Sequence, residues 1–547
     1  NENWARIWTN ELLDTLFRRR YIDPQTGQPT SQARADRALQ LGSSMTSVPV
    51  VVGDMILVNE GLLIRAWDRL TGRTIWAHSF GSSVGLRPSG LVGDLGEIVV
   101  NGDAAVTVVG HAFGSDRDGS GEIVRFNPET GEERWRIRPD RLKSDQDLKD
   151  AFVSGPPIIH GDVVFLPLRK VNNRLETIEF VVAIDLDLGE LRWVQPLGSS
   201  GGVRMGSSRP FFRLAILDGD VIVCSPVGVA ARLDGLTGRP QWLRTFEIPL
   251  RSPQGSSQPW QIGGPVLLRT GIASISPSLN EWILLNPENG DLLQNYPIGV
   301  GTPLGAAKYL LASDENEMGT ELIIGVGNGI HVIDSANPTV MRWSYEGTNS
   351  SGSSTTYPPE VKLIRGRVQV ASDGLAVPTL SGLAIVSLDD GEIDGIIGDG
   401  SIGNPLVYEN QVFLAGDLFL SAYMSVDNAV QALRMRLNED PGNVIQGVAL
   451  FELARRAGNT ELAIEACELC VSGLSSQNDD DIRKDVLNQI LGALDDDFLP
   501  IDDADRFHNF AAQIASTPEE NVKRLLARGD WSMKHDQLRK AVESWRE

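Results

Sequence analysis

The stretch NPETGEERWRIRP, Asn127–Pro139, begins with turn residues and continues as a short charged strand that carries one Trp. Three other stretches have the same form: DRLTGRTIW from Asp68, DLDLGELRW from Asp185 and DGLTGRPQW from Asp234. In each, an Asp or Asn is followed four residues later by Gly and eight residues later by Trp. Because a turn that recurs with its Trp in place is typical of a repeated unit, the sequence predicts a repeat architecture.

Three further copies are weaker. Asn286–Gly290 keeps the turn but has Gln294 at the Trp place, Asp334 is followed by Pro338 instead of Gly, and Ser387–Gly391 has no Trp. Successive turns begin about 48 to 59 residues apart, which is the period expected of a four-stranded propeller blade. The predicted structural positions of the repeat are Gly72, Gly131, Gly189, Gly238 and Gly290, with Trp76, Trp135, Trp193, Trp242 and Trp343.

Upstream of each turn, short β-branched runs alternate with a tight turn. In PVVVGDMILVNEGLLIRAWD, from Pro49, a Gly-Asp turn separates the first two runs and a third run follows. With the Trp-bearing strand, each unit contains four antiparallel strands. Gly tolerates the positive φ of such turns, and a Trp offers a large apolar face for packing between blades. We therefore predict a mainly β protein, a β-propeller.

An eighth unit is incomplete. PLVYENQVFLAGDLFLSAYM, Pro405–Met424, matches the first three strands of a unit, but no turn and no Trp strand follow. A ring that lacks one outer strand can take it from the other end of the chain. We expect WARIW, Trp4–Trp8, to supply it, which makes eight blades.

The repeated D-x-x-T-G-x-x-x-W resembles the blade motif of the quinoprotein-like (PQQ-like) propellers, which include pyrroloquinoline quinone (PQQ) alcohol dehydrogenases and BamB-like assembly lipoproteins. The resemblance implies a PQQ-like propeller over residues 45–424, preceded by a segment 1–44 that holds the closing strand and a helix or loop. Because such propellers are typically exported, it also implies the bacterial cell envelope. The motif is specific for the fold and not for function.

Residues 425–547 differ in composition, with Ala, Leu, Glu and Arg in place of β-branched runs. Helical periodicity from Val444 to Val471 is interrupted by AGNTE, a short helix–helix turn. The spacing of the small and apolar residues resembles a tetratricopeptide (TPR) repeat; they are Leu450, Ala454, Gly458, Ala463, Cys467 and Cys470. We therefore predict a TPR-like α-helical domain.

Two features of this tail resemble metal or redox sites. Cys467 and Cys470 form C-x-x-C, but both lie late in a predicted helix, whereas a redox pair opens one. We therefore favour packing over metal or redox chemistry. The acidic runs near Asp479 and Asp495 favour solvated turns and helix N-termini over cation binding.

DRDGSGEIV, from Asp116, resembles a calcium loop. Asp116, Asp118 and Ser120 alternate and Gly121 stands sixth, as in an EF-hand. Position twelve is Asn127 rather than a bidentate Glu, and predicted strands flank the loop instead of helices. Calcium binding by Asp116, Asp118, Ser120 and Asn127 is one hypothesis, and a polar loop in the second blade is the other.

The resemblance also raises the question of an enzyme. The quinoprotein alcohol dehydrogenases use a quinone in the central channel, a calcium ion beside it and a vicinal Cys–Cys disulfide, but no two Cys are adjacent in this chain. There is no C-x-x-C-H haem motif, and the six His occur singly. We predict that the chain is not an enzyme and needs no cofactor, with calcium the one possible ligand.

The net charge of the chain limits the classes of partner that it can bind. At −23, the surface repels a phosphate backbone, which argues against nucleic acid, and no apolar run reaches the ~18 residues of a membrane span. Because the chain begins at Asn1 without Met, we expect a processed or truncated product whose targeting signal is not in view.

The sequence therefore predicts a protein-interaction scaffold or assembly factor that binds proteins through the propeller faces and a TPR-like groove. Residues 20–41, 142–151 and 347–359 are candidate contact loops, the last equally a loop without a role. Two alternatives stay open: a PQQ- and calcium-dependent dehydrogenase, and a propeller that senses a ligand in its channel. The partner's identity and the oligomeric state do not follow from the sequence.

Overall fold

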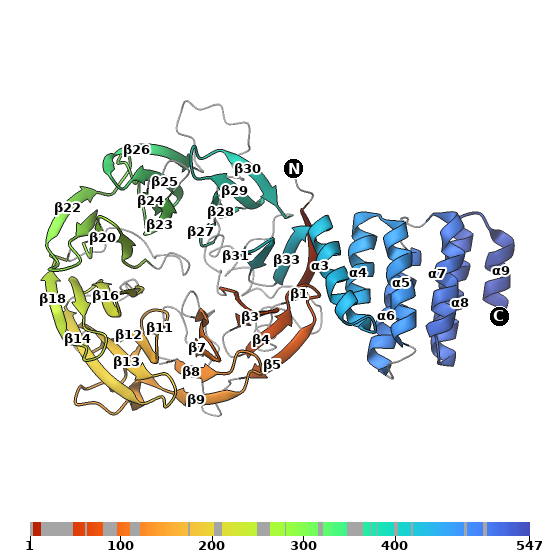
Figure 1. Cartoon of the computed structure of the whole chain (residues 1–547), viewed down its shortest axis with the longest axis horizontal. Helices are drawn as coiled ribbons and strands as arrows, with labels where there is room; N and C mark the ends of the chain where they lie inside the picture. Colours follow the sequence, from red (N-terminus) through yellow and green to blue (C-terminus); the bar gives the residue numbers. More distant parts are fainter. Residues whose placement is uncertain are drawn as a thin grey trace. The chain divides into compact units, whose positions relative to one another are not determined.

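The fold is a propeller of eight four-stranded antiparallel blades followed by helices, as the sequence predicted (Figure 1). The computed structural model describes residues 4–11, 48–60, 63–79, 96–109, 121–172, 176–201, 211–248, 263–278, 280–315, 321–346, 364, 366–371, 374–379, 381–398, 403–416, 419–474, 479–495 and 500–547. Two of the candidate contact loops, 20–41 and 347–359, lie outside these residues.

The first four blades follow one another along the chain, each from its inner to its outer strand. Their strands are β2(Val50–Val52), β3(Met55–Asn59), β4(Leu63–Asp68) and β5(Thr74–Ser79); β6(Val99–Asn101), β7(Ala104–Val109), β8(Glu122–Phe126) and β9(Glu133–Ile137); β10(Phe152–Val153), β11(Ile158–His160), β12(Val163–Val171), β13(Thr177–Asp185) and β14(Leu191–Ser200); and β15(Ala215–Leu217), β16(Asp220–Ser225), β17(Val229–Leu233) and β18(Pro240–Thr245). In the third blade, two short strands, β10 and β11, both pair with β12.

The other four blades repeat the pattern. Their strands are β19(Val266–Leu268), β20(Gly271–Ile275), β21(Glu281–Leu285) and β22(Leu292–Pro297); β23(Tyr309–Glu315), β24(Glu321–Val326), β25(Gly329–Asp334) and β26(Asn337–Glu346); β27(Gln369–Val370), β28(Gly374–Thr379), β29(Gly382–Ser387) and β30(Ile393–Ile397); and β31(Asn404–Tyr408), β32(Gln411–Ala415), β33(Phe419–Ser425) and β1(Trp4–Glu11). β1 therefore occupies the outer place of the eighth blade, where the sequence predicted a strand from the N-terminal end.

Burial follows the position of each strand in its blade. The second strand of the second blade, β7, reads AAVTVV and is buried at every position, because neighbouring blades cover both of its faces. The outer strand of the first blade, β5, reads TIWAHS and has no fully buried residue. This contrast explains the apolar runs in the sequence before each turn and the charged residues after it.

The hydrophobic core lies between blades. One cluster joins Val106 and Ile123 of the second blade to Leu166 and Val182 of the third, and similar clusters join the other described pairs from the first blade to the seventh. The candidate contact loop 142–151 contributes Leu148 and Ala151 to the first of these clusters. That loop is therefore partly built into the core.

The chain divides into two compact units. The first comprises Thr9–Asp68 and Arg73–Ser421, which hold most of the propeller. The second comprises Asn1–Trp8, Arg69–Gly72 and Ala422–Glu547. The second unit thus contains the start of β1 and the turn of the first blade together with the helices.

Seven helices are described after the propeller. They are α3(Val426–Glu439), α4(Val444–Ala457), α5(Thr460–Leu474), α6(Asp480–Asp495), α7(Ile501–Ile514), α8(Pro518–Lys534) and α9(Leu538–Arg546). The side chain of Asn443 caps the start of α4, and Gly458 ends this helix in the left-handed conformation. Thr517 and Glu520 form a capping box at the start of α8. Asp479 Oδ1 accepts hydrogen bonds from the first backbone N–H groups of α6, which gives the first acidic run a capping role.

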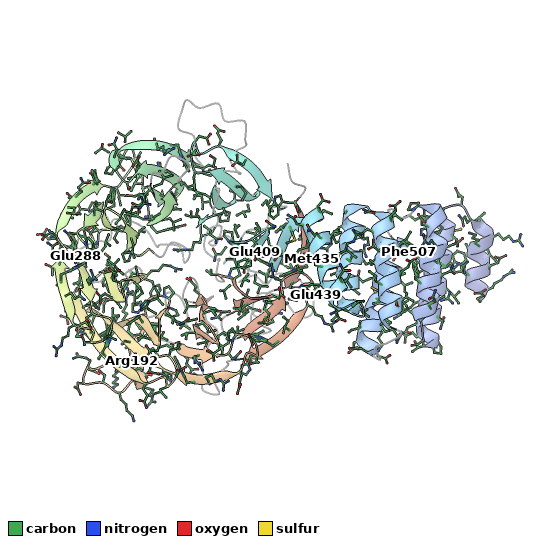
Figure 2. All side chains as sticks on the ribbon, in the orientation of Figure 1. Arg192, Glu288, Glu409, Met435, Glu439 and Phe507 are labelled. Atoms are coloured by element: carbon green, nitrogen blue, oxygen red, sulfur yellow. The ribbon has the colours of Figure 1, made fainter. Side chains whose placement is uncertain are left out.

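The helices pack in two rows, α4 with α6 and α8 in one, α5 with α7 in the other. Phe507 of α7, labelled in Figure 2, is fully buried. Its ring centroid lies 6.0 Å from those of Phe451 in α4 and Phe510. Among the described helices, none is long and apolar enough to cross a bilayer.

Candidate functional site

The Trp residues of the repeat connect neighbouring blades. In each case the indole Nε1 donates a hydrogen bond to a backbone carbonyl in the turn of the next blade, and that carbonyl belongs to the residue directly after the turn's first residue. The pairs are Trp76 with Pro128 (3.1 Å), Trp135 with Leu186 (2.8 Å), Trp193 with Gly235 (3.0 Å), Trp242 with Pro287 (2.9 Å) and Trp343 with Leu388 (2.8 Å). The recurring Trp therefore fixes one blade to the next.

The Gly of each turn lies against the same indole. Gly131 has φ of 72°, and a Cβ atom placed there would lie 2.6 Å from the ring of Trp76. The backbone conformation and the contact both require Gly. The same close approach occurs at Gly189, Gly238, Gly290 and Gly391.

Trp8 makes the sixth such contact, which the repeat analysis did not include. Its Nε1 donates to the carbonyl oxygen of Arg69 at 3.0 Å, and its ring lies against Gly72. The sequence does contain a signal for this pairing: Gly72 has no blade before it in the chain to provide a Trp, and Trp8 ends the strand predicted to close the ring.

At the two other blade junctions the Trp place is filled by Gln294 in β22 and Gly395 in β30. Between the fifth and sixth blades, Trp282 of β21 is buried and stacks on Tyr296 with ring centroids 4.8 Å apart. Trp282 belongs to the hydrophobic cluster that joins these blades. It has a packing role there, while Trp260, the other Trp outside the repeat in that region, lies outside the described residues.

The closing strand β1 is also held from α4. Arg456 Nη1 donates to the carbonyl oxygens of Arg6 at 2.9 Å and Ile7 at 2.5 Å, and its Nη2 bonds Glu452 at 3.3 Å. Burial raises the pKa of Glu452 and lowers the pKa of Arg456. The outer edge of a sheet presents unpaired backbone groups, and Arg456 satisfies two of them.

Polar side chains at the inner ends of the blades bind one another. Glu97, Arg213 and Arg367 each stand two residues before an inner strand, namely β6, β15 and β27. Arg213 donates to Glu97 at 2.5 Å across the third blade. The guanidinium of Arg367 lies 4.8 Å from the ring centroid of Tyr309, and its backbone N–H donates to Asn404 Oδ1 at 2.9 Å.

These contacts concern the question whether the inner ends could hold a quinone with a calcium ion. Such a group would need a carboxylate and an amide oxygen near the channel. Among the inner-end residues named above, Glu97 supplies a carboxylate, and the guanidinium of Arg213 binds its Oε2. The amide oxygen of Asn404 accepts the N–H of Arg367. These two oxygens are therefore already engaged by hydrogen-bond donors of the chain itself.

The four residues of the candidate calcium loop are only partly described. Asp116, Asp118 and Ser120 lie outside the described residues. Asn127 Oδ1 accepts hydrogen bonds from the N–H groups of Glu129 (2.8 Å) and Thr130 (3.2 Å). Asn127 therefore organises the repeat turn, as the Asp or Asn of such turns commonly does.

The two neighbouring cysteines are buried in α5. Cys470 Sγ lies 3.8 Å from the carbonyl oxygen of Val444, and a Cβ on Gly447 would lie 2.8 Å from that sulfur. Burial raises the pKa of Cys470 to about 12 and that of Cys467 further. A buried thiol with a raised pKa is unreactive at neutral pH, so the pair serves close packing between α4 and α5.

Comparison with known proteins places this geometry in a family. The fold and the Trp–Gly contacts between blades define a PQQ-like β-propeller. The family model of the outer membrane protein assembly factor BamB matches residues 20–291 and 119–344. The chain belongs to this family. A search of curated proteins finds no match.

Solved structures with a similar fold include both assembly factors and enzymes. BamB from Moraxella catarrhalis is 15% identical, with a TM-score of 0.44, covering 70% of this chain and 97% of its own. A quinohemoprotein alcohol dehydrogenase, ADHIIG from Pseudomonas putida HK5, is 11% identical (TM-score 0.47; 77% and 76% covered). A europium-containing methanol dehydrogenase is 10% identical (TM-score 0.49; 77% and 93%). At such identities the likeness concerns the fold alone.

Proposed function

We propose that the chain is a non-catalytic protein-interaction scaffold, an assembly factor of the bacterial cell envelope that needs no cofactor. The observation that carries the proposal is the engagement of the inner-end polar groups with each other: Glu97 with Arg213, and Asn404 with Arg367. These groups stabilise the ring from inside, and the Trp–Gly contacts stabilise it near the rim. A ring held together in this way suits binding through its faces and loops. Membership of the BamB assembly-factor family supports this function and its location.

The propeller offers one specific candidate contact. Leu188 and Leu236 stand on the turns of the third and fourth blades and are 69% and 81% exposed. These turns are neighbours, because Trp193 of the third blade donates to Gly235 in the turn of the fourth. Two exposed leucines on adjacent turns can anchor in an apolar pocket of a partner protein. The helical rows supply a second surface of the TPR-like kind.

The test is affinity capture from envelope extracts with matched variants of the full chain. We expect one or a few specific proteins to bind, and Leu188→Asp with Leu236→Asp to reduce their recovery at least tenfold. Leu293→Asp is the control, because Leu293 is also exposed but lies on the outer strand β22. If the double variant and the control recovered the same amount of partner, the turns that carry Leu188 and Leu236 would not be the contact surface. Turnover of an alcohol with an artificial electron acceptor would overturn the scaffold itself.

A further inference from the structure

Helices α8 and α9 each expose a row of apolar side chains. Val522, Leu526 and Met533 in α8 and Leu538, Val542 and Trp545 in α9 are each 43 to 59% exposed; we call these six residues the terminal apolar face. Their spacing of three, four or seven places each set on one side of its helix. A Cβ on Gly529 of α8 would lie 2.0 Å from Trp545 Nε1, so the indole lies directly on α8 and joins the two sets.

The helix pair α4 with α5, two pairs earlier in the chain, contains positions that correspond to part of this face. α5 begins at Thr460 and α9 at Leu538, 78 positions apart. The same offset relates Val542 to Ile464 and Trp545 to Cys467. Both α5 residues are buried, and α5 packs against α7 of the following pair. Two residues of the α9 part of the terminal apolar face therefore correspond to positions that are buried in α5.

We propose that a second copy of this chain covers the terminal apolar face, with α8 and α9 of each copy packed against α8 and α9 of the other. Charge favours this occupant. The chain as a whole carries −23, so two copies repel each other over most of their surfaces. Residues 518–547 carry seven Lys or Arg and six Asp or Glu. This segment can therefore meet its own copy without net repulsion.

The charges beside the face also complement each other. By helical spacing, Arg539 and Arg546 border the apolar set of α9, and Glu519 and Asp530 border that of α8. Within one copy, Glu519 pairs with Lys523 on the surface, a contact of small energy. A two-fold arrangement that places α9 against α8 of the second copy brings the basic border to the acidic one twice. The inference concerns self-association and goes beyond the proposed scaffold function.

The test is the mass of the full chain in solution, by light scattering and sedimentation velocity over about 1 to 100 µM. We expect twice the mass of one chain. Leu538→Glu with Val542→Glu should raise the dimer dissociation constant by at least ~100-fold, because it buries charge in an apolar contact. Val340→Glu on β26, exposed to a similar degree, should leave the dimer intact. Far-UV circular dichroism establishes that each variant keeps its helices.

A second pair of variants tests the charges. Arg539→Glu with Arg546→Glu should weaken the dimer, and adding Glu519→Arg with Asp530→Arg should restore it. A monomer at every concentration, or a dimer that Leu538→Glu with Val542→Glu leaves unchanged, would overturn the proposal. A monomer that sediments with phosphatidylglycerol vesicles through Leu538 and Val542 would assign the face to a membrane surface instead. An unmodified chain that is monomeric at every concentration but still captures its partners would refute this inference alone, not the scaffold.

Discussion

Trp8 and Gly72 stand 64 positions apart in the chain, and the indole of Trp8 lies on Gly72 while its Nε1 donates to the neighbouring carbonyl of Arg69. Five other Trp residues make the same contact between blades that are consecutive in sequence. Trp8 alone among the six makes it between the closing strand of the eighth blade and the turn of the first. The repeat is therefore completed by a residue from the beginning of the chain.

We expect Trp8→Ala to lower the free energy of unfolding by about 3 to 5 kcal/mol, because it removes a buried indole and leaves a cavity. Trp8→Phe retains most of the packing and loses the hydrogen bond, so its cost should be nearer 1 kcal/mol. Urea unfolding followed by circular dichroism measures both. Unfolding curves for Trp8→Ala that coincide with the unmodified chain would show that the contact does not hold the ring.

The turn glycines allow a comparison within one blade. Gly131 and Gly102 both have positive φ, 72° and 58°, but a Cβ on Gly131 meets Trp76 at 2.6 Å, whereas a Cβ on Gly102 meets nothing within 4 Å. Gly102→Ala should cost about 1 kcal/mol from backbone strain alone. Gly131→Ala should cost at least about 2 kcal/mol more, because the indole must move. Equal melting temperatures for the two variants would contradict the contact.

Arg456→Ala should loosen the closing strand. The change removes two hydrogen bonds to β1 and the ion pair with the half-buried Glu452, at a cost of about 1 to 2 kcal/mol. Hydrogen exchange should rise at residues 4–8. Arg434→Ala is the control, since Arg434 pairs with Glu465 on the surface and its loss should cost less than about 1 kcal/mol. Unchanged exchange in Arg456→Ala would refute this role.

Because of the buried His508, we predict that the stability of the helical region depends on pH. Neither of its ring nitrogens has a hydrogen-bond partner in the described structure, and burial lowers its pKa to about 4. Arg528, Arg524 and Lys540 also lower it, and Asp505 raises it. Between pH 6.5 and 4 the unfolded chain binds the proton that the folded chain does not, so stability should fall as pH falls through this window.

The matched variant is His508→Phe, which keeps the ring in the core and removes the titration. We expect its unfolding free energy between pH 6.5 and 4 to fall by about 1 to 3 kcal/mol less than that of the unmodified chain. Urea unfolding at several pH values, followed by the helical signal at 222 nm, measures this. If the unfolding free energies of the variant and the unmodified chain fell in parallel with pH, a group other than His508 would control the loss of stability in acid.

Sequence reasoning could predict the features that repeat. The Asp/Asn–Gly–Trp spacing, the β-branched runs and the short eighth unit together predict eight four-stranded blades and the closing strand at Trp4–Trp8. The change of composition after Val426 predicts helices, and the late position of Cys467 in its helix predicts packing. Each of these depends on local spacing, which the chain displays directly.

The remaining features depend on residues far apart in sequence. Arg213 and Glu97 are separated by 116 positions, and no local pattern indicates that the ring brings them together. Arg456 lies in α4, whereas Arg6 and Ile7 lie near the start of the chain. The hydrogen bonds between them therefore cannot be predicted from local sequence. Trp282 lies outside the repeat, and its packing role is apparent only from its contact with Tyr296 and the cluster between two blades. The exposure of the apolar side chains of α8 and α9 is apparent only when the packing of the helices is known.

The central claim, a scaffold without a quinone cofactor, is tested most directly by a thermal melt of the full chain with and without PQQ plus calcium, with absorption spectra recorded alongside. A ligand that binds the folded state alone must raise the melting temperature. We predict the same melting temperature in both samples and no quinone spectrum on the protein after desalting. A rise of several degrees together with a bound quinone spectrum would contradict the account and make the inner ends of the blades a cofactor site.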